Sequence, residues 1–247
     1  MAANEQAQVS EWLRSLYMEA DRELSEAPPE RILQWVGENF GKRAGISCSF
    51  GGPGGVVLAH MASQFAPESK ILFVDTGFLF PETYALRDRL EAEWGLRVVT
   101  AEPDLSPSKQ EELYGPRLWE RDPGLCCHLR KVEPMDKLLA QVDCWVTALR
   151  RDQSPTRAGV RRFELHEVSP LHSVLKVNPL ADWSGADVWN YVHERGLPYN
   201  PLLDDGYPSL GCIYCTARAD GPDERAGRWK GTSKTECGLH TFTRQMR

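Results

Sequence analysis

Hydrophobic positions in the first 150 residues alternate between helical spacing and short continuous runs. Residues 29–39 place apolar side chains three and four positions apart, follow Pro28 and end near Gly41, which predicts an amphipathic helix. Short apolar runs bounded by turn residues predict buried strands at 45–50, 71–74, 97–100 and 144–149. Further helices are expected at 11–24, 56–64, 81–94 and 132–141. This alternation predicts an α/β fold on a doubly wound, mostly parallel sheet, with ligands at the carboxyl ends of the strands.

The pattern changes toward the C-terminus. Ser184 to Asp187 resembles a capping box, with Asp in place of the usual Glu, and predicts a helix over 188–195 that Gly196 ends. Residues 197–247 are rich in Pro, Gly, Asp and Cys and show little periodicity. Without an internal repeat or a clear linker, we expect a single domain, residues 1–247, whose loop-rich segment 197–247 is functional and needs something to hold it.

Composition excludes several classes of protein. The 247 residues carry a net charge of -6 and are 41% hydrophobic, which is typical of a globular chain that needs no disulfide to fold. The acidic balance argues against general nucleic-acid binding, and no apolar run approaches the roughly 18 residues of a membrane span. The first residues lack the basic start and apolar stretch of a secretory signal, so we expect a cytoplasmic protein.

Seven cysteines are unusual in a chain expected in a reducing compartment, and an odd number cannot all pair. Cys126-Cys127 and Cys212-x-x-Cys215 offer four thiolates, the number that a zinc ion or a [4Fe-4S] cluster takes. Adjacent cysteines suit zinc less well, because its paired thiols are usually two to four residues apart, whereas a cluster has four separate irons. Spacing therefore favours the cluster and leaves zinc as the alternative. Cys48 and Cys144 lie in predicted apolar strands, so we expect both side chains to be buried.

A glycine-rich turn, Gly51–Gly55, follows the first predicted strand. Its backbone N–H groups and the next helix N-terminus can bind a phosphate or sulfate, although an ordinary turn is equally compatible. No Gly-Lys-Ser/Thr follows, which excludes the P-loop of nucleotide triphosphatases. Asp75 lies at the end of the next predicted strand, where its carboxylate could contact the edge of a nucleotide or simply cap the turn.

Basic residues cluster in this acidic chain: Arg150, Arg151, Arg157, Arg161 and Arg162, followed later by Arg225, Arg228 and Lys230. A solvated face would explain them, but beside a strand end and a thiolate site they also suit a small polyanionic substrate. Nearby cations would lower the pKa of the Cys237 thiol, so that it could serve as a nucleophile. The alternative is an adventitious cysteine without a role.

Ten short segments occur in a fixed order: Ser49–Gly52, Val74–Gly77, Pro81–Tyr84, Cys126–Pro134, Arg150–Pro155, Asn178–Trp183, Leu197–Pro201, Gly206–Cys212, Asp223–Trp229 and Glu236–His240. Together they resemble the assimilatory adenylyl-sulfate reductases, the iron-sulfur branch of the phosphosulfate reductase family. The resemblance covers about Ser47 to His240. It implies a fold of the ATP pyrophosphatase, or PP-loop, type.

The resemblance also implies a [4Fe-4S] cluster on the four paired cysteines and Cys237 as the nucleophile. In this family the thiolate attacks the sulfur of adenosine 5′-phosphosulfate, AMP leaves, and thioredoxin, here a separate protein, releases sulfite. The oligomeric state stays open, with a homo-oligomer as one alternative. Matching positions imply that phosphate and sulfate are held by Lys131, Arg225, Arg228 and His240. The other substrate-binding candidates are Ser49, Gly51, Gly52, Asp75, Arg150 and Arg151.

Three departures from the family pattern stand out. The turn Ser49–Val56 lacks a hydroxyl and two acidic side chains that are common in the family. Phe78 and Phe80 replace basic and His positions, so we expect a more apolar nucleoside side and a preference for the substrate without a 3′-phosphate. His60 replaces an acidic residue.

Two other functions compete with this interpretation. An adenylating ATP pyrophosphatase would share the fold and the glycine turn, but it would not need the four paired cysteines. A zinc-binding module would explain those cysteines and leave Cys237 without a role.

Overall fold

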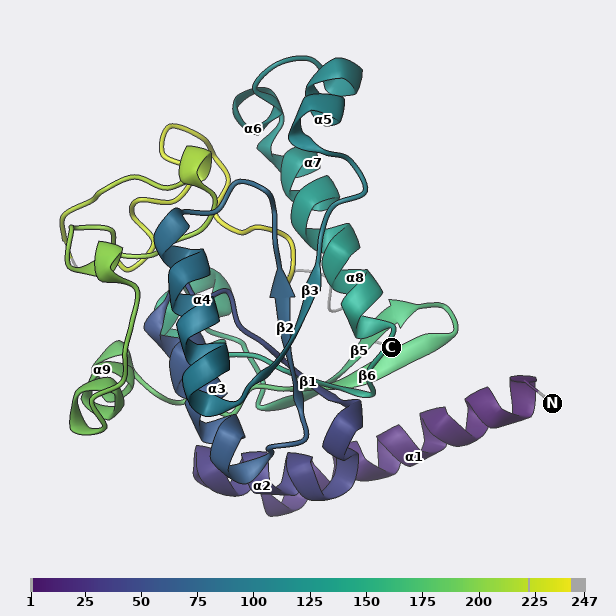
Figure 1. The fold of residues 1–247 in the computed structure, drawn as a ribbon. Helices are drawn as coiled ribbons and strands as arrows, with labels where there is room; N and C mark the ends of the chain where they lie inside the picture. Colours follow the sequence, from purple (N-terminus) through teal and green to yellow (C-terminus); the bar gives the residue numbers. More distant parts are fainter. Residues whose placement is uncertain (1, 222, 241–247) are drawn as a thin grey trace.

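The sheet is mostly parallel, as the hydrophobic pattern predicts. The computed structural model describes residues 2–221 and 223–240. Within this part of the chain the strand order is β3-β2-β1-β4-β6-β5, and all neighbours are parallel except β5 with β6. The strands are β1 Ala44–Ser47, β2 Lys70–Val74, β3 Arg97–Ala101, β4 Cys144–Val146, β5 Phe163–Ser169 and β6 His172–Val177. The predicted α/β class is therefore confirmed (Figure 1).

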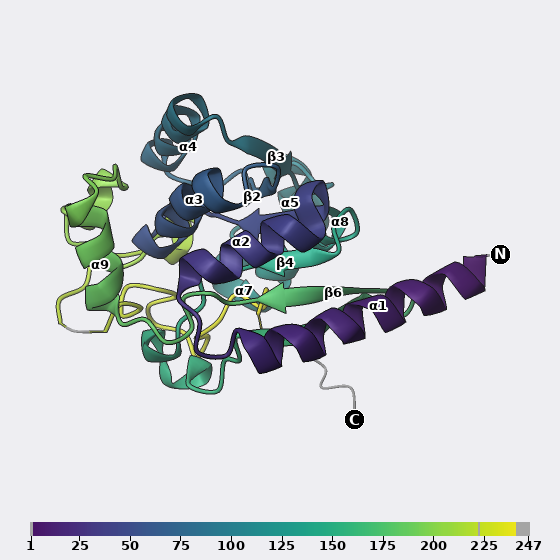
Figure 2. The ribbon, with the colours of Figure 1, turned by 90° about the horizontal axis from the view of Figure 1, so that it is seen from below.

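Helices cover both faces of the sheet. Because side chains alternate along a strand, Ile71 and Phe73 join the core formed with α1, α2 and α3, whereas Leu72 packs with Met135 and Leu139 of α8 on the other face. Figure 2 shows α1 lying along β6 and extending past the sheet. The helices are α1 Ala2–Glu23, α2 Pro29–Phe40, α3 Pro53–Phe65, α4 Pro81–Trp94, α5 Pro107–Tyr114, α6 Leu118–Arg121, α7 Pro123–Cys127, α8 Glu133–Leu139 and α9 Gly185–Glu194.

Proline begins several of these helices, because its fixed φ and missing N–H cost nothing at the first helical position. The examples are Pro29, Pro53, Pro81, Pro107 and Pro123. The capping box predicted at Ser184 is present: its Oγ accepts from the Asp187 N–H, and the Asp187 side chain accepts from the Ser184 N–H. No helix among the described residues is long and apolar enough to cross a bilayer.

The hydrophobic pattern did not predict the β5–β6 hairpin. Charged residues hide the alternation of apolar and polar side chains in this hairpin. Lys176 Nζ lies 2.7 Å from Glu164 Oε1, and the Lys176 side chain is only 2% exposed. The stretch expected to be a polar loop contains α5, α6 and α7, and a π-helical turn, His128–Val132, joins α7 to α8. Two strands are also shorter than expected, since β1 ends at Ser47 and β4 at Val146.

The loop-rich segment is held against the carboxyl ends of the strands. Leu79 and Cys212 form an isolated β-bridge, and the Ile213 N–H donates to the Phe78 carbonyl over 2.8 Å. The amide of Asn200, which is buried, donates to the Phe50 carbonyl. Contacts with the loops that follow β1 and β2 therefore replace regular secondary structure as the support of this segment (Figure 1).

Candidate active site

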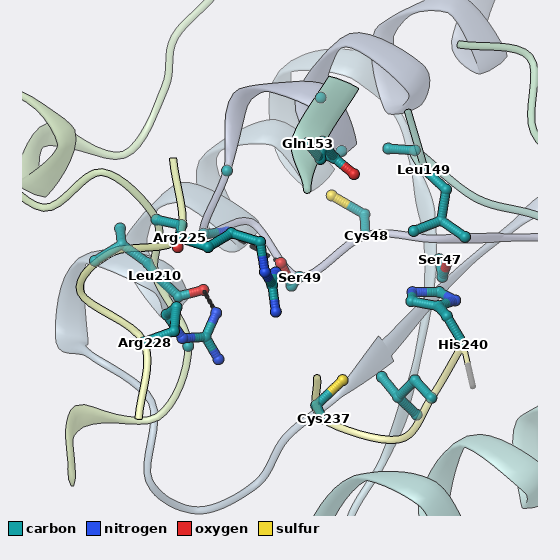
Figure 3. Close-up of a pocket in the computed structure, with 18 of the residues that line it drawn as sticks. Ser47, Cys48, Ser49, Leu149, Gln153, Leu210, Arg225, Arg228, Cys237 and His240 are labelled. Atoms are coloured by element: carbon teal, nitrogen blue, oxygen red, sulfur yellow. Dashed lines mark hydrogen bonds between the residues drawn. The ribbon is translucent and has the colours of Figure 1, made fainter. Parts of the chain in front are cut away.

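A cavity of about 270 Å³ lies where β1, β2 and β4 end. One wall is the turn between β1 and α3, and another is the segment after β4. The loop-rich segment closes the cavity with Leu210, Arg225, Arg228, Cys237 and His240 (Figure 3). The location is the one expected for a ligand site in an open α/β sheet.

The glycine-rich turn forms the floor of this cavity. The predicted residues Ser49, Gly51 and Gly52 all line it. Gly52 is the N-cap of α3 and gives no side-chain hydrogen bond, so N–H groups of the first helical turn stay available to an anion. A Cβ at Gly51 would lie 3.1 Å from the Leu210 carbonyl oxygen, so the absence of a side chain lets the tail pack closely over the turn.

Five basic side chains line the cavity, but most are bound to carboxylates. Arg150, only 2% exposed, donates to Asp152 over 2.9 Å and to Glu224 over 2.7 Å. It therefore links the segment after β4 to the loop-rich segment. Arg157 and Arg225 both donate to Glu236. The remaining two, Lys131 and Arg228, have no carboxylate partner among the described residues.

Buried polar atoms without a partner concentrate around the same cavity. Seven such side-chain atoms occur among the described residues, and four belong to cavity-lining residues: Ser209 Oγ, Arg228 Nε, Trp229 Nε1 and His240 Nδ1. Buried polar groups are normally hydrogen-bonded, so a cluster of unpaired ones indicates a site built for a polar ligand.

Cys237 and His240 reach the cavity from the end of the described chain. Figure 3 shows the Cys237 thiol pointing into the space between Arg228 and His240. His240 stacks on Trp145 of β4. Burial lowers the pKa of His240 well below its usual value, and the cations of Lys176 and Arg157 lower it further. His240 is therefore neutral at neutral pH and acts as a hydrogen-bonding group, not as a cation.

The four paired cysteines line a second, smaller pocket. Cys126 and Cys127 end α7, and Cys212 and Cys215 flank a 3₁₀ turn. Burial raises the pKa of Cys126 to about 12, and the other three thiols of the pocket raise it as well, because a thiolate is unfavourable beside other thiolates. All seven cysteines are free thiols.

The arrangement of the thiols bears on what they could hold. Within the described chain, no three Cys, His, Asp or Glu side chains converge tightly enough to hold one metal ion. A zinc ion requires its ligands about 2.3 Å from a single centre. A [4Fe-4S] cluster instead binds its four thiolates at different irons, so its ligands surround a wider space. The four thiols that line this pocket are the donor set of a [4Fe-4S] cluster, and the adjacent pair Cys126 and Cys127 suits separate irons better than a single ion.

Lys131 connects the two pockets, because it lines both. Lys131 is buried, and burial by itself lowers the pKa of an amine. The neighbouring cysteines together outweigh burial, so the pKa of Lys131 is raised. Arg130, beside it, is fixed elsewhere: its guanidinium donates to the Thr76 carbonyl and lies 4.3 Å from the centre of the Phe78 ring. Of the two, Lys131 is the residue free to act on a ligand.

Two predicted binding residues lie outside the cavity lining. Asp75 accepts from the Gly77 N–H over 2.8 Å and from the Tyr84 hydroxyl over 2.7 Å, so it caps the turn after β2. Arg151 pairs with Asp182 and donates to the Val160 carbonyl. Both residues hold loops in place and do not face the cavity.

The two phenylalanines that depart from the family pattern also lie outside the lining of the large cavity. Phe78 lines the thiol pocket, and Phe80 packs on Tyr207 with ring centroids 5.7 Å apart, so neither lines the large cavity. Contacts with two neighbouring helices account for His60. Its Nδ1 lies 3.0 Å from the hydroxyl of Tyr191 in α9, and its ring packs on Trp94 in α4.

Cavity residues that the sequence did not single out include Gln153, Ser209, Leu210 and Glu224. They come from loops without periodicity, and the only signal was that all four lie within segments that carry the family resemblance. Glu224, for example, lies in Asp223–Trp229 and directly precedes Arg225.

Comparison with known proteins identifies the fold and its relatives. Residues 43–218 match the phosphoadenosine phosphosulfate reductase domain. The chain is 45% identical to the adenosine 5′-phosphosulfate reductase of Streptomyces coelicolor, over 97% of this chain and 100% of that protein. It is 43% identical to the phosphoadenosine 5′-phosphosulfate reductase of Gloeobacter violaceus, over 89% of this chain and 91% of that protein.

Solved structures agree with this likeness. The phosphoadenylyl-sulfate reductase of Candida auris, in a phosphate complex, superimposes with a TM-score of 0.70 at 30% identity, covering 81% of this chain and 96% of that one. The FMN adenylyltransferase of Candida glabrata gives a TM-score of 0.54 at 14% identity, covering 86% of this chain and 74% of that one, which shows the fold alone. The sheet thus has the PP-loop-type architecture.

Proposed function

Because the chain belongs to the phosphoadenosine phosphosulfate reductase family, we propose that it reduces adenosine 5′-phosphosulfate to sulfite and AMP, with thioredoxin as the reductant. This reaction belongs to assimilatory sulfate reduction, which supplies cysteine biosynthesis. The observation that carries the proposal is that Cys237 shares one cavity with Lys131 and Arg228, beside the pocket of four thiols.

The reaction begins with attack of the Cys237 thiolate on the sulfur of the substrate. The S–O bond to the phosphate breaks, AMP leaves with the electron pair, and an S-sulfocysteine remains on the enzyme. Both reactants are anions, so cations are needed where charge gathers on the leaving phosphate. Lys131 and Arg228 supply them, because neither is bound to a carboxylate among the described residues.

The second half-reaction supplies the electrons. A thiolate of reduced thioredoxin attacks Cys237 Sγ, sulfite leaves with the S–S bonding pair, and a mixed disulfide forms. The second thiol of thioredoxin then attacks that disulfide, which regenerates the Cys237 thiol and leaves thioredoxin oxidised. Two electrons thus pass from one dithiol to one sulfate sulfur, and no metal needs to change its oxidation state.

The cofactor proposed for the second pocket is a [4Fe-4S] cluster held by Cys126, Cys127, Cys212 and Cys215. The donor set of four thiols, two of them adjacent in the chain, supports a cluster over a single zinc ion. When bound, the cluster would link α7 to the loop-rich segment and add its charge beside Lys131.

The proposed substrate lacks a 3′-phosphate, although relatives named for either substrate are similarly identical to this chain. The support comes from the charges of the cavity. Arg150, Arg157 and Arg225 are bound to carboxylates, and the two other lining cations match the phosphate and sulfate of adenosine 5′-phosphosulfate. A 3′-phosphate would need a further cation.

The experiment that tests the proposal is a comparison of substrates with anaerobically purified protein and reduced thioredoxin. Sulfite and AMP should form in equal amounts, and kcat/KM should be at least about tenfold higher for adenosine 5′-phosphosulfate than for its 3′-phosphorylated form. Absence of sulfite from both substrates would contradict the proposed activity, and equal kcat/KM values would contradict the proposed preference.

A further inference from the structure

Glu236 immediately precedes Cys237 and makes four hydrogen bonds at the edge of the cavity. Arg157 grips it with two: Nε donates to Oε1 over 2.9 Å and Nη2 to Oε2 over 2.8 Å. Arg225 Nη2 donates to Oε2 over 3.2 Å, and the Thr156 hydroxyl donates to Oε1 over 3.0 Å. A bidentate arginine-carboxylate pair fixes orientation as well as distance.

This ion-pair cluster is largely shielded from water. The side chains of Arg157, Arg225 and Glu236 are 12%, 16% and 10% exposed, respectively. An ion pair on the open surface contributes little, whereas removing one partner of a shielded pair leaves an uncompensated charge. Glu236 is therefore a strong attachment point for the end of the chain.

The charges around Glu236 show what it compensates. Burial lowers the pKa of Arg225, and Arg157 and Arg228 lower it further because they are like charges. Glu236 acts in the opposite direction. Burial alone would raise the pKa of Glu236, but its bonds to Arg157 and Arg225 outweigh burial and lower it. The carboxylate thus holds together two arginines that would otherwise repel each other.

A second attachment lies on the other side of Cys237. His240 stacks on Trp145 with ring centroids 5.4 Å apart, and Leu239 packs against the core beneath α8. Cys237 is therefore held on both sides, by the hydrogen bonds of Glu236 and by the packing of Leu239 and His240. Consecutive Cα atoms are about 3.8 Å apart, so fixing Glu236 restricts the position of Cys237.

We propose that Glu236 is a positioning residue, a carboxylate latch that holds Cys237 in the cavity for attack on the substrate. The inference rests on the proposed function of Cys237. It divides the basic residues into two groups: Arg157 and Arg225 hold the tail, and Lys131 and Arg228 serve the substrate. The first half-reaction depends on this placement of Cys237, whereas the second requires only that thioredoxin reach the thiol, which is partly exposed.

The first test separates the half-reactions in the variant Glu236→Gln, which keeps the size of the side chain and removes its charge. Single-turnover sulfonation of Cys237 should slow by at least about tenfold, because the nucleophile is less well placed. Release of sulfite by thioredoxin from enzyme that already carries the sulfonate should stay within about threefold of the wild type or become faster. The dissociation constant for AMP should also stay within about threefold.

The matched control is Asp143→Asn. Asp143 is also a partly buried carboxylate paired with an arginine, 2.9 Å from Arg43 Nη1, but it precedes β4 at the opposite end of the sheet. Both half-reactions should be unchanged in this variant. Arg157→Gln should reproduce the effect of Glu236→Gln, and the double variant should be no slower than the slower single variant, because both changes break one interaction.

Limited trypsin digestion gives a readout that does not depend on catalysis. Cleavage after Lys234, quantified by mass spectrometry, should be at least about fivefold faster in Glu236→Gln and Arg157→Gln than in the wild type and Asp143→Asn, because the tail opens more often. Unchanged cleavage together with unchanged sulfonation would overturn the latch and leave the proposed function intact. Failure of wild-type Cys237 to be sulfonated at all would instead overturn the proposed function.

Discussion

The imidazole of His240 stacks on the indole of Trp145, with planes only 16° apart, and this contact joins the tail to the central strand β4. His166 also packs on Trp145, with ring centroids 5.0 Å apart, and Lys176 Nζ lies 5.2 Å from the centre of the same ring. The tail that carries Cys237 is thus seated on a buried group of aromatic and basic side chains. Two of its members, His166 and His240, are held neutral by their surroundings.

Stability should therefore fall in mild acid. Burial and then Lys176 lower the pKa of His166 to about 4, so between about pH 6.5 and 4 the unfolded chain binds a proton that the folded chain does not. Over this window each such histidine costs up to about 1.4 kcal/mol of stability per pH unit. Urea unfolding between pH 7 and 5 should show a smaller decrease in His166→Gln than in the wild type. Equal slopes would mean that His166 is protonated in the folded state.

Substrate affinity should depend on Arg228 more than on Arg225. Arg228 Nε is buried without a partner, so the side chain has a donor available to an anion, whereas Arg225 Nη2 is bound to Glu236 and to the Thr235 carbonyl. Arg228→Ala should weaken AMP binding by roughly tenfold to a hundredfold, and Arg225→Ala by less than about threefold. Isothermal titration with AMP distinguishes the two, and a larger loss in Arg225→Ala would contradict the division of roles.

The thiol pocket should contain iron. Anaerobically prepared protein should carry about four irons and four sulfides per chain and absorb near about 400 nm. Cys212→Ser should lose the iron and also raise trypsin cleavage after Lys234, because the cluster would no longer join the loop-rich segment to α7. One zinc per chain without iron would refute the cluster.

The hydrophobic pattern sufficed for β1, β2, β3 and β4, because each has a short apolar run, and β1, β2 and β4 are mostly buried. It failed for β5 and β6, because the buried Lys176–Glu164 pair and His166 look like surface residues in a sequence. The spacing of the four cysteines was sufficient to predict that they share a pocket. The position of Phe78 after β2 did not reveal that its side chain lines the same pocket as those cysteines.

The role of Glu236 could not be read from the sequence for a similar reason. Its partner Arg157 belongs to a turn formed about 80 residues earlier in the chain, and only the folded tail brings the two together. Arg157 and Arg225 were recognised as part of a basic cluster, but a cluster of cations in a sequence does not say which of them are already neutralised.

Replacement of the proposed nucleophile should separate binding from chemistry. Cys237→Ser should abolish sulfite formation while AMP binding and the absorbance near about 400 nm persist, because an alcohol is too weakly acidic to replace the thiolate. Cys144→Ala is a suitable comparison, since Cys144 is buried outside the cavity lining and burial raises the pKa of its thiol. Turnover close to the wild-type value in Cys237→Ser would show that another group attacks the substrate.

The most direct measurement is mass spectrometry of the wild-type protein after reaction with adenosine 5′-phosphosulfate in the absence of thioredoxin. The account predicts an added mass of about 80 Da, one sulfonate, on the peptide that contains Cys237, with one equivalent of AMP released. Reduced thioredoxin should then remove the added mass and release sulfite. An adduct on a different cysteine, or AMP release without any adduct, would contradict the account.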